Sequence, residues 1–320
     1  MTLSVALCTY NGESFIREQL ESILNQTMTV DEIIVCDDMS TDKTLDIVEQ
    51  IKTATTVPIY IHRNDKQLGA QNNFQQAVNL CHGDIIFLSD QDDIWMPEKV
   101  QTIVNFFDNN KSISTVFTNA NLIDSDNNPT GEYIFDYFFD TLSHKLFDKG
   151  LGAERFAYSN CATGATMAIQ RGRYENIRFS VYCTEGIFHD YVIAIQALTQ
   201  KALAYIDTPL IKYRIHSNQS VGLSCEKPPI KTWKEPFIGN YTPFLQVAQS
   251  DYLNQRIQFL EYRKKIKYTP SGALKAISKL PVYLKYYNSH GLSLLLYDMY
   301  ASLKHAILRR ANNNDTRILD

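Results

Sequence analysis

An acidic cluster directly after an apolar run is the strongest chemical signal in the sequence. Asp90, Asp92 and Asp93 lie within Ser89–Trp95, immediately after the apolar residues 85–88. Three carboxylates this close together repel one another unless a cation or hydrogen bonds offset their charge. Mg²⁺ and Mn²⁺ prefer oxygen ligands, and Mg²⁺ typically combines one or two carboxylates with substrate phosphates. The cluster therefore indicates a divalent metal site that also takes a phosphate-bearing ligand; the alternative is a solvated acidic turn.

Two further polar segments follow apolar runs earlier in the chain. Thr9–Gly12 comes directly after residues 3–8, and the pair Asp37–Asp38 comes directly after residues 33–36. In open parallel sheets, ligands bind at the carboxyl ends of the strands. If all three apolar runs are neighbouring parallel strands, their polar ends form a single crevice.

The elements that must position these segments alternate between strands and helices. Apolar runs predict strands at 3–8, 33–36, 59–61 and 85–88, and apolar residues at helical spacing predict helices at 13–26, 42–52 and 72–80, with a further helix opened by Pro97. This alternation predicts an α/β fold with a mostly parallel sheet and helices on both faces. Beyond it, short strands are expected at 114–118, 166–170, 202–206 and 211–215.

Taken together, three motifs resemble those of the family 2 inverting glycosyltransferases with the GT-A fold. The motifs are Val5–Gly12, Val35–Asp42 and Leu88–Trp95, and the resemblance covers roughly residues 1–220. It points to bacterial rhamnosyltransferase-like enzymes of capsule, O-antigen and exopolysaccharide assembly. The fold implied is a Rossmann-like, mostly parallel central sheet flanked by helices, and the ligand implied is a nucleotide diphosphate sugar.

The resemblance assigns the binding of the nucleotide diphosphate sugar, the sugar donor, to four residues. Thr9 and Tyr10 would line the nucleotide base site, and Asp38 would accept a hydrogen bond from the pyrimidine N–H. Asp90 would face the ribose or the metal. The alternative for Asp38 is a turn or helix-capping residue. The family usually has glycine after the paired aspartates, where this chain has Met39, so the turn is expected to differ there.

The same resemblance assigns the metal, Mn²⁺ or Mg²⁺, to Asp92 and His216. Asp92 would bind the ion that bridges the diphosphate. His216 lies in Tyr213–Asn218, which resembles the late Arg-x-His element of the family, and its neutral imidazole would be a second ligand. A core or loop histidine with one hydrogen bond is the alternative for His216.

A transferase also needs a base to take the proton of the attacking hydroxyl. Asp190 is the candidate, because it lies at the start of a helix-like stretch, 192–198, whose amides can hold a carboxylate ionised. The resemblance supports the choice, since the family's base aspartate lies well downstream of its metal motif. The alternative is an ordinary N-cap aspartate.

Charge is distributed unevenly along the chain. Residues 1–255 carry 19 Lys and Arg against 31 Asp and Glu, a net −12, whereas residues 256–310 carry 11 basic and 2 acidic residues, a net +9. We therefore expect a catalytic domain at 1–225, a linker at 226–250 and a basic helical region at 251–320 that attaches to anionic membrane surfaces. The alternative is a helical appendage packed on the catalytic domain. No apolar run is long enough to span a bilayer, and no basic-aromatic motif indicates nucleic acid.

The function expected is inverting transfer of a sugar, from dTDP-rhamnose or a UDP-sugar, to a hydroxyl of a growing bacterial surface glycan that is lipid-linked or an oligosaccharide. Other polysaccharide-assembly enzymes are candidate partners. A cytoplasmic location, peripheral to the membrane, is expected because the first residues lack the features of an export signal. The alternatives are an inactive relative that binds glycans or acts as a scaffold, and a sugar nucleotidyltransferase. The latter needs a glycine-rich basic loop after the first strand, which Thr9–Glu13 is not.

Overall fold

The structure is a computed structural model that describes residues 1–139, 141–148, 156, 160–174, 188–217 and 219. The chain divides into two compact units, Met1–Lys234 and Glu235–Asp320. The second unit lies outside the described residues, and so do the predicted linker and basic helical region. The predicted domain division therefore remains a prediction.

The first third of the chain alternates strands and helices, as the sequence predicts. The elements are β1 (Leu3–Thr9), α1 (Ile16–Leu24), β2 (Glu32–Asp37), α2 (Thr44–Ala54), β3 (Ile59–Arg63), α3 (Ala70–Leu80) and β4 (Ile85–Ser89). Every residue of β1 and β4 is buried. Strands this apolar must be covered on both faces, which is typical of a parallel sheet between helices.

The rest of the described chain has shorter and less regular elements. They are β5 (Ile94–Trp95), α4 (Lys99–Asn109), β6 (Thr115–Ile123), β7 (Pro129–Tyr133), α5 (Ile134–Phe138), α6 (Thr141–Asp148), β8 (Ala168–Gln170), α8 (His189–Thr199) and β9 (Leu203–Arg214), with 3-10 turns at Gly164–Thr166 and Arg171–Arg173. None of the helices within the described ranges is long and apolar enough to cross a membrane.

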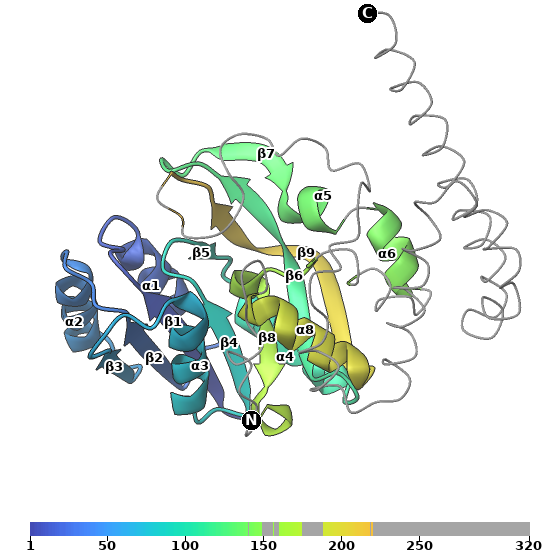
Figure 1. The fold of residues 1–320 in the computed structure, drawn as a ribbon, viewed down its shortest axis with the longest axis horizontal. Helices are drawn as coiled ribbons and strands as arrows, with labels where there is room; N and C mark the ends of the chain where they lie inside the picture. Colours follow the sequence, from blue (N-terminus) through green and yellow to red (C-terminus); the bar gives the residue numbers. More distant parts are fainter. Residues whose placement is uncertain (140, 149–155, 157–159, 175–187, 218, 220–320) are drawn as a thin grey trace, which may run out of the picture. The chain divides into compact units, whose positions relative to one another are not determined.

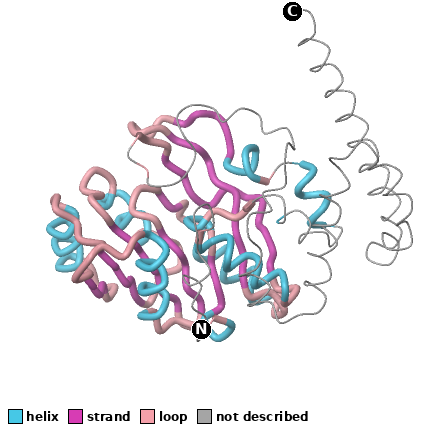
Figure 2. The backbone as a smooth tube through the Cα atoms, viewed as in Figure 1, coloured by secondary structure: helices cyan, strands magenta, loops and turns pink. Residues whose placement is uncertain are grey.

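The strands form one sheet in the order β3-β2-β1-β4-β8-β6-β9-β5, with β7 paired to β6 (Figures 1 and 2). The strands β1, β2, β3, β4, β6 and β9 run in one direction, and β5, β7 and β8 run against them. The chain moves outward from β1 to β3 and then returns to β4. Right-handed crossovers therefore place α1 and α2 on the opposite face from α3, which packs beside α8 (Figure 1).

Three of the expected strands were wrong in extent. The segments 202–206 and 211–215 form the single strand β9, whose pairing with β6 shifts register where Asn119 lies opposite Pro209. A proline has no N–H to donate to a ladder, so it marks an irregularity within β9 and not its end. The expected strand at 166–170 begins at Ala168, because Gly164–Thr166 forms a 3-10 turn.

Candidate active site

The carboxyl ends of β2, β1 and β4 meet at one edge of the sheet. Thr9 lies opposite Asp37, and Leu7 lies opposite Ser89. The polar segments that follow these strands therefore share this edge, which is the crevice that the sequence predicts.

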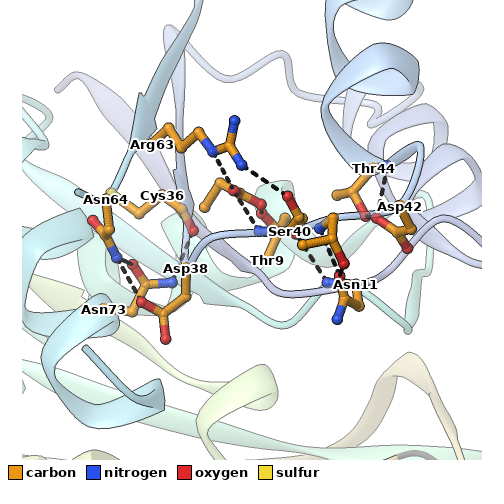
Figure 3. Close-up of polar contacts among 12 residues, drawn as sticks. Thr9, Asn11, Cys36, Asp38, Ser40, Asp42, Thr44, Arg63, Asn64 and Asn73 are labelled. Carbon is orange, nitrogen blue, oxygen red and sulfur yellow. Dashed lines mark hydrogen bonds and ion pairs between the residues drawn. The ribbon is translucent and has the colours of Figure 1, made fainter. Parts of the chain in front are cut away.

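Asp37 is completely buried and supports the turn after β2 (Figure 3). It accepts hydrogen bonds from the Thr9 hydroxyl at 2.9 Å and from the Ser40 amide at 2.9 Å, and it pairs with the Arg63 guanidinium at 3.8 Å. The Thr9 side chain is thus engaged inside the protein and is 2% exposed. Thr9 contributes to the shape of the site, and its predicted contact with a base remains a prediction.

Asp38 holds the loop that leads into α3. Its Oδ1 accepts from the Leu68 amide at 2.7 Å and from the Asn64 side chain at 2.8 Å, and its Oδ2 accepts from the Gly69 amide at 2.9 Å (Figure 3). A carboxylate has about four lone-pair sites, so one on Oδ2 is left for a ligand N–H. The sequence motif did not reveal this second role of Asp38, because the loop 64–69 carries no signal of its contact.

Met39 occupies an uncommon backbone conformation. Its φ is 71°, in the left-handed region that glycine adopts readily and a bulky side chain adopts at a cost. A glycine at this position, which the resemblance leads us to expect, would adopt this φ without that cost, and methionine adopts it here.

Asp92 and His216 meet across 124 residues of sequence. His216 Nε2 lies 2.9 Å from Asp92 Oδ2, and both side chains are largely buried, at 9% and 15% exposure. The His216 ring packs on Phe15, with 4.8 Å between ring centroids. The structure thus brings together the two residues predicted to bind the metal.

The other two carboxyls of the cluster are shifted toward the neutral form. Burial raises the pKa of Asp90 to about 7, with further contributions from the charges of Asp92 and Asp190. Burial also raises the pKa of Asp93 well above its usual range, although its Oδ1 accepts the Arg214 amide at 3.0 Å. The charges of Asp92 and Asp190 both act on Asp90, which indicates that these two carboxyls lie near Asp90.

The metal-ligating side chains at this edge of the sheet fit a divalent cation only if a phosphate-bearing ligand supplies further oxygen atoms. Within the described ranges, no group of three or more His, Cys, Asp or Glu side chains is arranged to hold a metal ion. Asp92 and His216 offer one oxygen and one nitrogen, and Mg²⁺-type sites commonly complete such a set with phosphate oxygens. The residues present therefore fit an ion that is held jointly by the protein and a diphosphate.

Arg214 joins the end of β9 to the acidic cluster. Its side chain is completely buried. Its Nε donates to the Asp92 carbonyl at 2.7 Å, its Nη2 to Glu18 at 2.8 Å and its Nη1 to Asn127 at 2.6 Å. The guanidinium also lies over the Phe15 ring, 4.5 Å from the centroid. These contacts fix the strand end from which His216 approaches Asp92.

Asp190 lies in the first turn of α8, with Phe188 at the N-cap position. Its carboxylate accepts from the Gly164 amide at 3.2 Å and from the Tyr191 amide at 2.6 Å. Burial raises its pKa to about 6 despite these bonds. Asp190 is therefore a part-buried carboxyl with a raised pKa, and Phe188, not Asp190, occupies the N-cap position of the helix.

Lys99 is a buried cation that motif reasoning missed. Its Nζ donates to the Ala165 carbonyl at 3.0 Å and lies 3.8 Å from the centre of the Trp95 ring. Burial lowers the pKa of Lys99 to about 7, against the opposing influence of Asp93 and Asp90. Lys99 thus ties α4 to the turn whose Gly164 amide contacts Asp190. An isolated lysine after Pro97 gives no sign of this in the sequence.

Comparison with known proteins identifies the family. Residues 4–174 match the sequence profile of Glycosyl transferase family 2. The chain belongs to this family. It is 31% identical to dTDP-rhamnosyl transferase RfbG of Shigella flexneri over 228 residues, which cover 68% of this chain and 73% of RfbG.

Two other members extend the comparison. One is WfaP of Escherichia coli, a UDP-Glc:alpha-D-GlcNAc-diphosphoundecaprenol beta-1,3-glucosyltransferase. This chain is 34% identical to WfaP over 109 residues, a match that covers 34% of this chain and 42% of WfaP. The crystal structure of S. aureus TarS 1-349 in complex with UDP-GlcNAc superposes with a TM-score of 0.56 and 14% identity, covering 97% of this chain and 92% of the TarS 1-349 chain. At that identity the likeness concerns the fold, which is the predicted GT-A fold of a glycosyltransferase.

Proposed function

We propose that this family 2 glycosyltransferase is an inverting, metal-dependent enzyme. It transfers a sugar from a nucleotide diphosphate donor to a hydroxyl of a growing bacterial surface glycan. The observation that carries the proposal is the convergence of Asp92 and Asp190 on Asp90 at one sheet edge, where the charges of both act on Asp90. Transfer in a single displacement needs a group that accepts the proton of the acceptor hydroxyl, here Asp190. It also needs a carboxylate that faces the diphosphate, here Asp92.

Asp190 is the base in this proposal. The acceptor O–H gives its proton to Asp190 as the acceptor oxygen bonds to the anomeric carbon, and the bond from that carbon to the diphosphate oxygen breaks. The nucleoside diphosphate leaves with the electron pair. One displacement inverts the anomeric configuration. The pKa of about 6 keeps Asp190 mostly ionised at neutral pH, as a base requires.

Asp92 and His216 would hold Mn²⁺ or Mg²⁺ together with the diphosphate. A bound divalent ion offsets the negative charge that develops on the departing diphosphate. The chain's own residues hold Asp92 and His216 in place: Arg214 fixes the backbone of Asp92, and Phe15 packs on the His216 ring. Thr9, Tyr10 and Asp38 would surround the base, with Asp90 near the ribose or the ion.

The donor and acceptor are proposed from the relatives. RfbG is named as a dTDP-rhamnosyl transferase, and WfaP as a UDP-Glc enzyme with a diphosphoundecaprenol-linked acceptor. We infer dTDP-rhamnose or a UDP-sugar as donor and a lipid-linked glycan of the capsule or O-antigen type as acceptor. Such an acceptor would place the enzyme at the inner face of the cell membrane, beside other polysaccharide-assembly enzymes.

Donor binding and turnover test the proposal. The protein is screened by thermal shift with UDP-, dTDP- and GDP-sugars, with and without Mn²⁺, because a ligand that binds only the folded state raises Tm. The stabilising donor is then incubated with Mn²⁺, and release of nucleoside diphosphate is measured. Asp190→Asn should retain the thermal shift and lose turnover by about a hundredfold or more.

Each alternative has its own result in the same assays. Donor binding without turnover in the parent protein, with or without an acceptor, would indicate an inactive relative that binds glycans or acts as a scaffold. Release of pyrophosphate from a nucleoside triphosphate and a sugar phosphate would indicate a nucleotidyltransferase. Normal turnover in Asp190→Asn would remove Asp190 from the mechanism.

A further inference from the structure

We propose that Gln91, the residue between Asp90 and Asp92, is a positioning residue that holds Tyr10 in place for the nucleotide base. This inference rests on the proposed function, since it concerns how the donor is bound. It assigns a specific task to the middle residue of the acidic motif. The task is to join the base end of the donor site to its diphosphate end.

The Gln91 side chain pairs with both backbone polar groups of Tyr10. Its Oε1 accepts from the Tyr10 amide at 2.8 Å, and its Nε2 donates to the Tyr10 carbonyl at 3.0 Å. A side-chain amide that satisfies the N–H and the C=O of one residue imitates a neighbouring strand. The backbone pairing of β1 with β4 ends at Leu7 and Ser89, so Gln91 continues it beyond the strand ends.

The backbone of Tyr10 is thereby fixed while its ring stays accessible. Tyr10 is 43% exposed, one of the few large apolar side chains with that much free surface in the described chain. The next residue, Asn11, has a φ of 47° and is held in turn by Ser40, whose hydroxyl accepts its amide at 2.9 Å. An exposed aromatic ring on a restrained backbone is suited to stacking on a flat ligand such as a base.

Gly12 gives independent support for the position of Gln91. A Cβ atom added at Gly12 would lie 2.2 Å from Gln91 Oε1 and 2.4 Å from its Cδ. The φ of Gly12 lies outside the left-handed region, so its backbone alone does not require glycine. A larger residue at position 12 would therefore displace the Gln91 amide from its place beside Tyr10.

This arrangement makes a specific prediction for substitutions at both positions. In Gly12→Ala the new methyl would displace the flexible end of Gln91 and break both hydrogen bonds to Tyr10, although glutamine is still present. Gln91→Met keeps the length of the side chain and removes its polar atoms. The two variants should therefore have the same defect, and Gly12→Ala should have no further effect once Gln91 is truncated to alanine.

The test is binding of UDP and dTDP by isothermal titration calorimetry with Mn²⁺, together with steady-state kinetics on the preferred nucleotide sugar. We expect Gln91→Met and Gly12→Ala each to weaken nucleotide binding about tenfold, which corresponds to about 1.4 kcal/mol, because the Tyr10 backbone loses its two hydrogen bonds to Gln91. KM for the donor should rise similarly, with kcat within about twofold of the parent, because the chemistry at Asp190 is untouched. The double variant Gln91→Ala/Gly12→Ala should bind as Gln91→Ala does, since the coupling is non-additive.

Several results would overturn the inference. Unchanged nucleotide affinity in Gln91→Met, or a loss of kcat with unchanged KM, contradicts it while leaving the proposed function intact. An additive effect of Gly12→Ala in the Gln91→Ala background also contradicts it. If Gly12→Ala does not fold, the inference is tested by the nucleotide affinities of Gln91→Met and Gln91→Ala, and affinities equal to that of the parent contradict it. A parent protein that binds neither nucleotide refutes the proposed function, and this inference with it.

Discussion

The carboxyl of Asp190 is subject to two opposing influences. Burial raises its pKa to about 6, while hydrogen bonds from the Tyr191 and Gly164 amides and from the Asn160 side chain act to lower it. A general base works best with a pKa near the working pH. The balance leaves Asp190 basic enough to accept a proton and still ionised at neutral pH.

The pH dependence of catalysis should report this balance. Because a base acts in its deprotonated form, kcat/KM should rise as pH increases through about 6 and level off above it. Asn160→Leu removes a hydrogen bond that favours the ionised form. It should therefore raise the pKa of Asp190 and move the rise to higher pH by about one pH unit.

Asp90, whose pKa is raised to about 7, is the other group that could control the rise, and a matched control tests whether an Asn→Leu change in itself moves the profile. Asn105→Leu removes an exposed amide on α4, which accepts a hydrogen bond from Gln101 at 2.9 Å, and should leave the profile unchanged. A profile that does not move in Asn160→Leu would show that another group controls the rise.

Sequence motifs predict which carboxylates meet at the sheet edge, but not what they contact. Asp38, Asp92 and Asp190 could be chosen because each lies in a motif or at the start of a predicted helix. The amides of Leu68 and Gly69 that bind Asp38, and the Gly164 amide that binds Asp190, belong to loops without periodicity. Their positions follow from tertiary packing, which a local pattern does not contain.

Among the elements, the end of β9 depends on one buried arginine. Arg214 connects this strand to α1 through Glu18 and to the turn after β6 through Asn127, and the Asn127 side chain itself donates to Glu18 at 2.9 Å. Removing one partner of a buried charge leaves the other without compensation. The three side chains therefore form a closed ring that supports the Asp92–His216 pair.

We expect Arg214→Met to lower the free energy of unfolding by about 3 kcal/mol, because it leaves the Asp92 carbonyl and the Asn127 side-chain oxygen without the donor that Arg214 supplies and removes one of the two donors to Glu18. It should also weaken Mn²⁺ binding in the presence of nucleotide, since the end of β9 carries His216. Urea denaturation and a Mn²⁺ titration measure the two effects.

Substitutions on α1 provide the control for this ring. Glu18→Ala should cost about 2 kcal/mol, because it leaves the buried guanidinium of Arg214 without its carboxylate, although water reaches Glu18, which is 44% exposed. Glu21 lies on the same helix and pairs with Arg17 at the surface at 3.7 Å, so Glu21→Ala should cost less than about 0.5 kcal/mol. Equal effects of Glu18→Ala and Glu21→Ala would contradict a special role for the ring.

The predictability of the elements changes along the chain for a physical reason. From β1 to β4, each buried run is separated from the next by a helix with a clear apolar face, and β1 and β2 each pair with the next strand along the chain, while β4 returns to β1. After β4, strands pair with distant partners: β8 joins β4 and β6, and β9 joins β6 and β5. Local patterning does not specify such pairings, which is why β9 was predicted as two strands.

At the scale of the whole molecule, charge separates two regions. The net −12 of residues 1–255 includes the acidic cluster at the site, and the net +9 of residues 256–310 lies almost entirely in the second compact unit, Glu235–Asp320. An acidic domain is repelled by anionic membranes, whereas a basic segment is attracted by about 1 kcal/mol for each basic residue near the surface. A lipid-linked acceptor would make such attraction useful, because it would confine the enzyme to the surface that holds the acceptor.

We therefore expect the full chain to bind vesicles that contain anionic lipid and to be released at high salt, where surface electrostatics are screened. Replacing Lys264, Lys265 and Lys267 with glutamate reverses three charges without shortening the chain, and should abolish co-sedimentation with anionic vesicles. A chain that ends at Tyr252 should lose vesicle binding while keeping nucleotide binding, because the residues proposed for the donor site all precede it.

Vesicles of neutral lipid are the control for the effect of charge. If the triple glutamate variant still binds anionic vesicles as the parent does, the basic region does not attach the enzyme to the membrane, and the remaining explanation for its charge is a helical appendage packed on the catalytic domain.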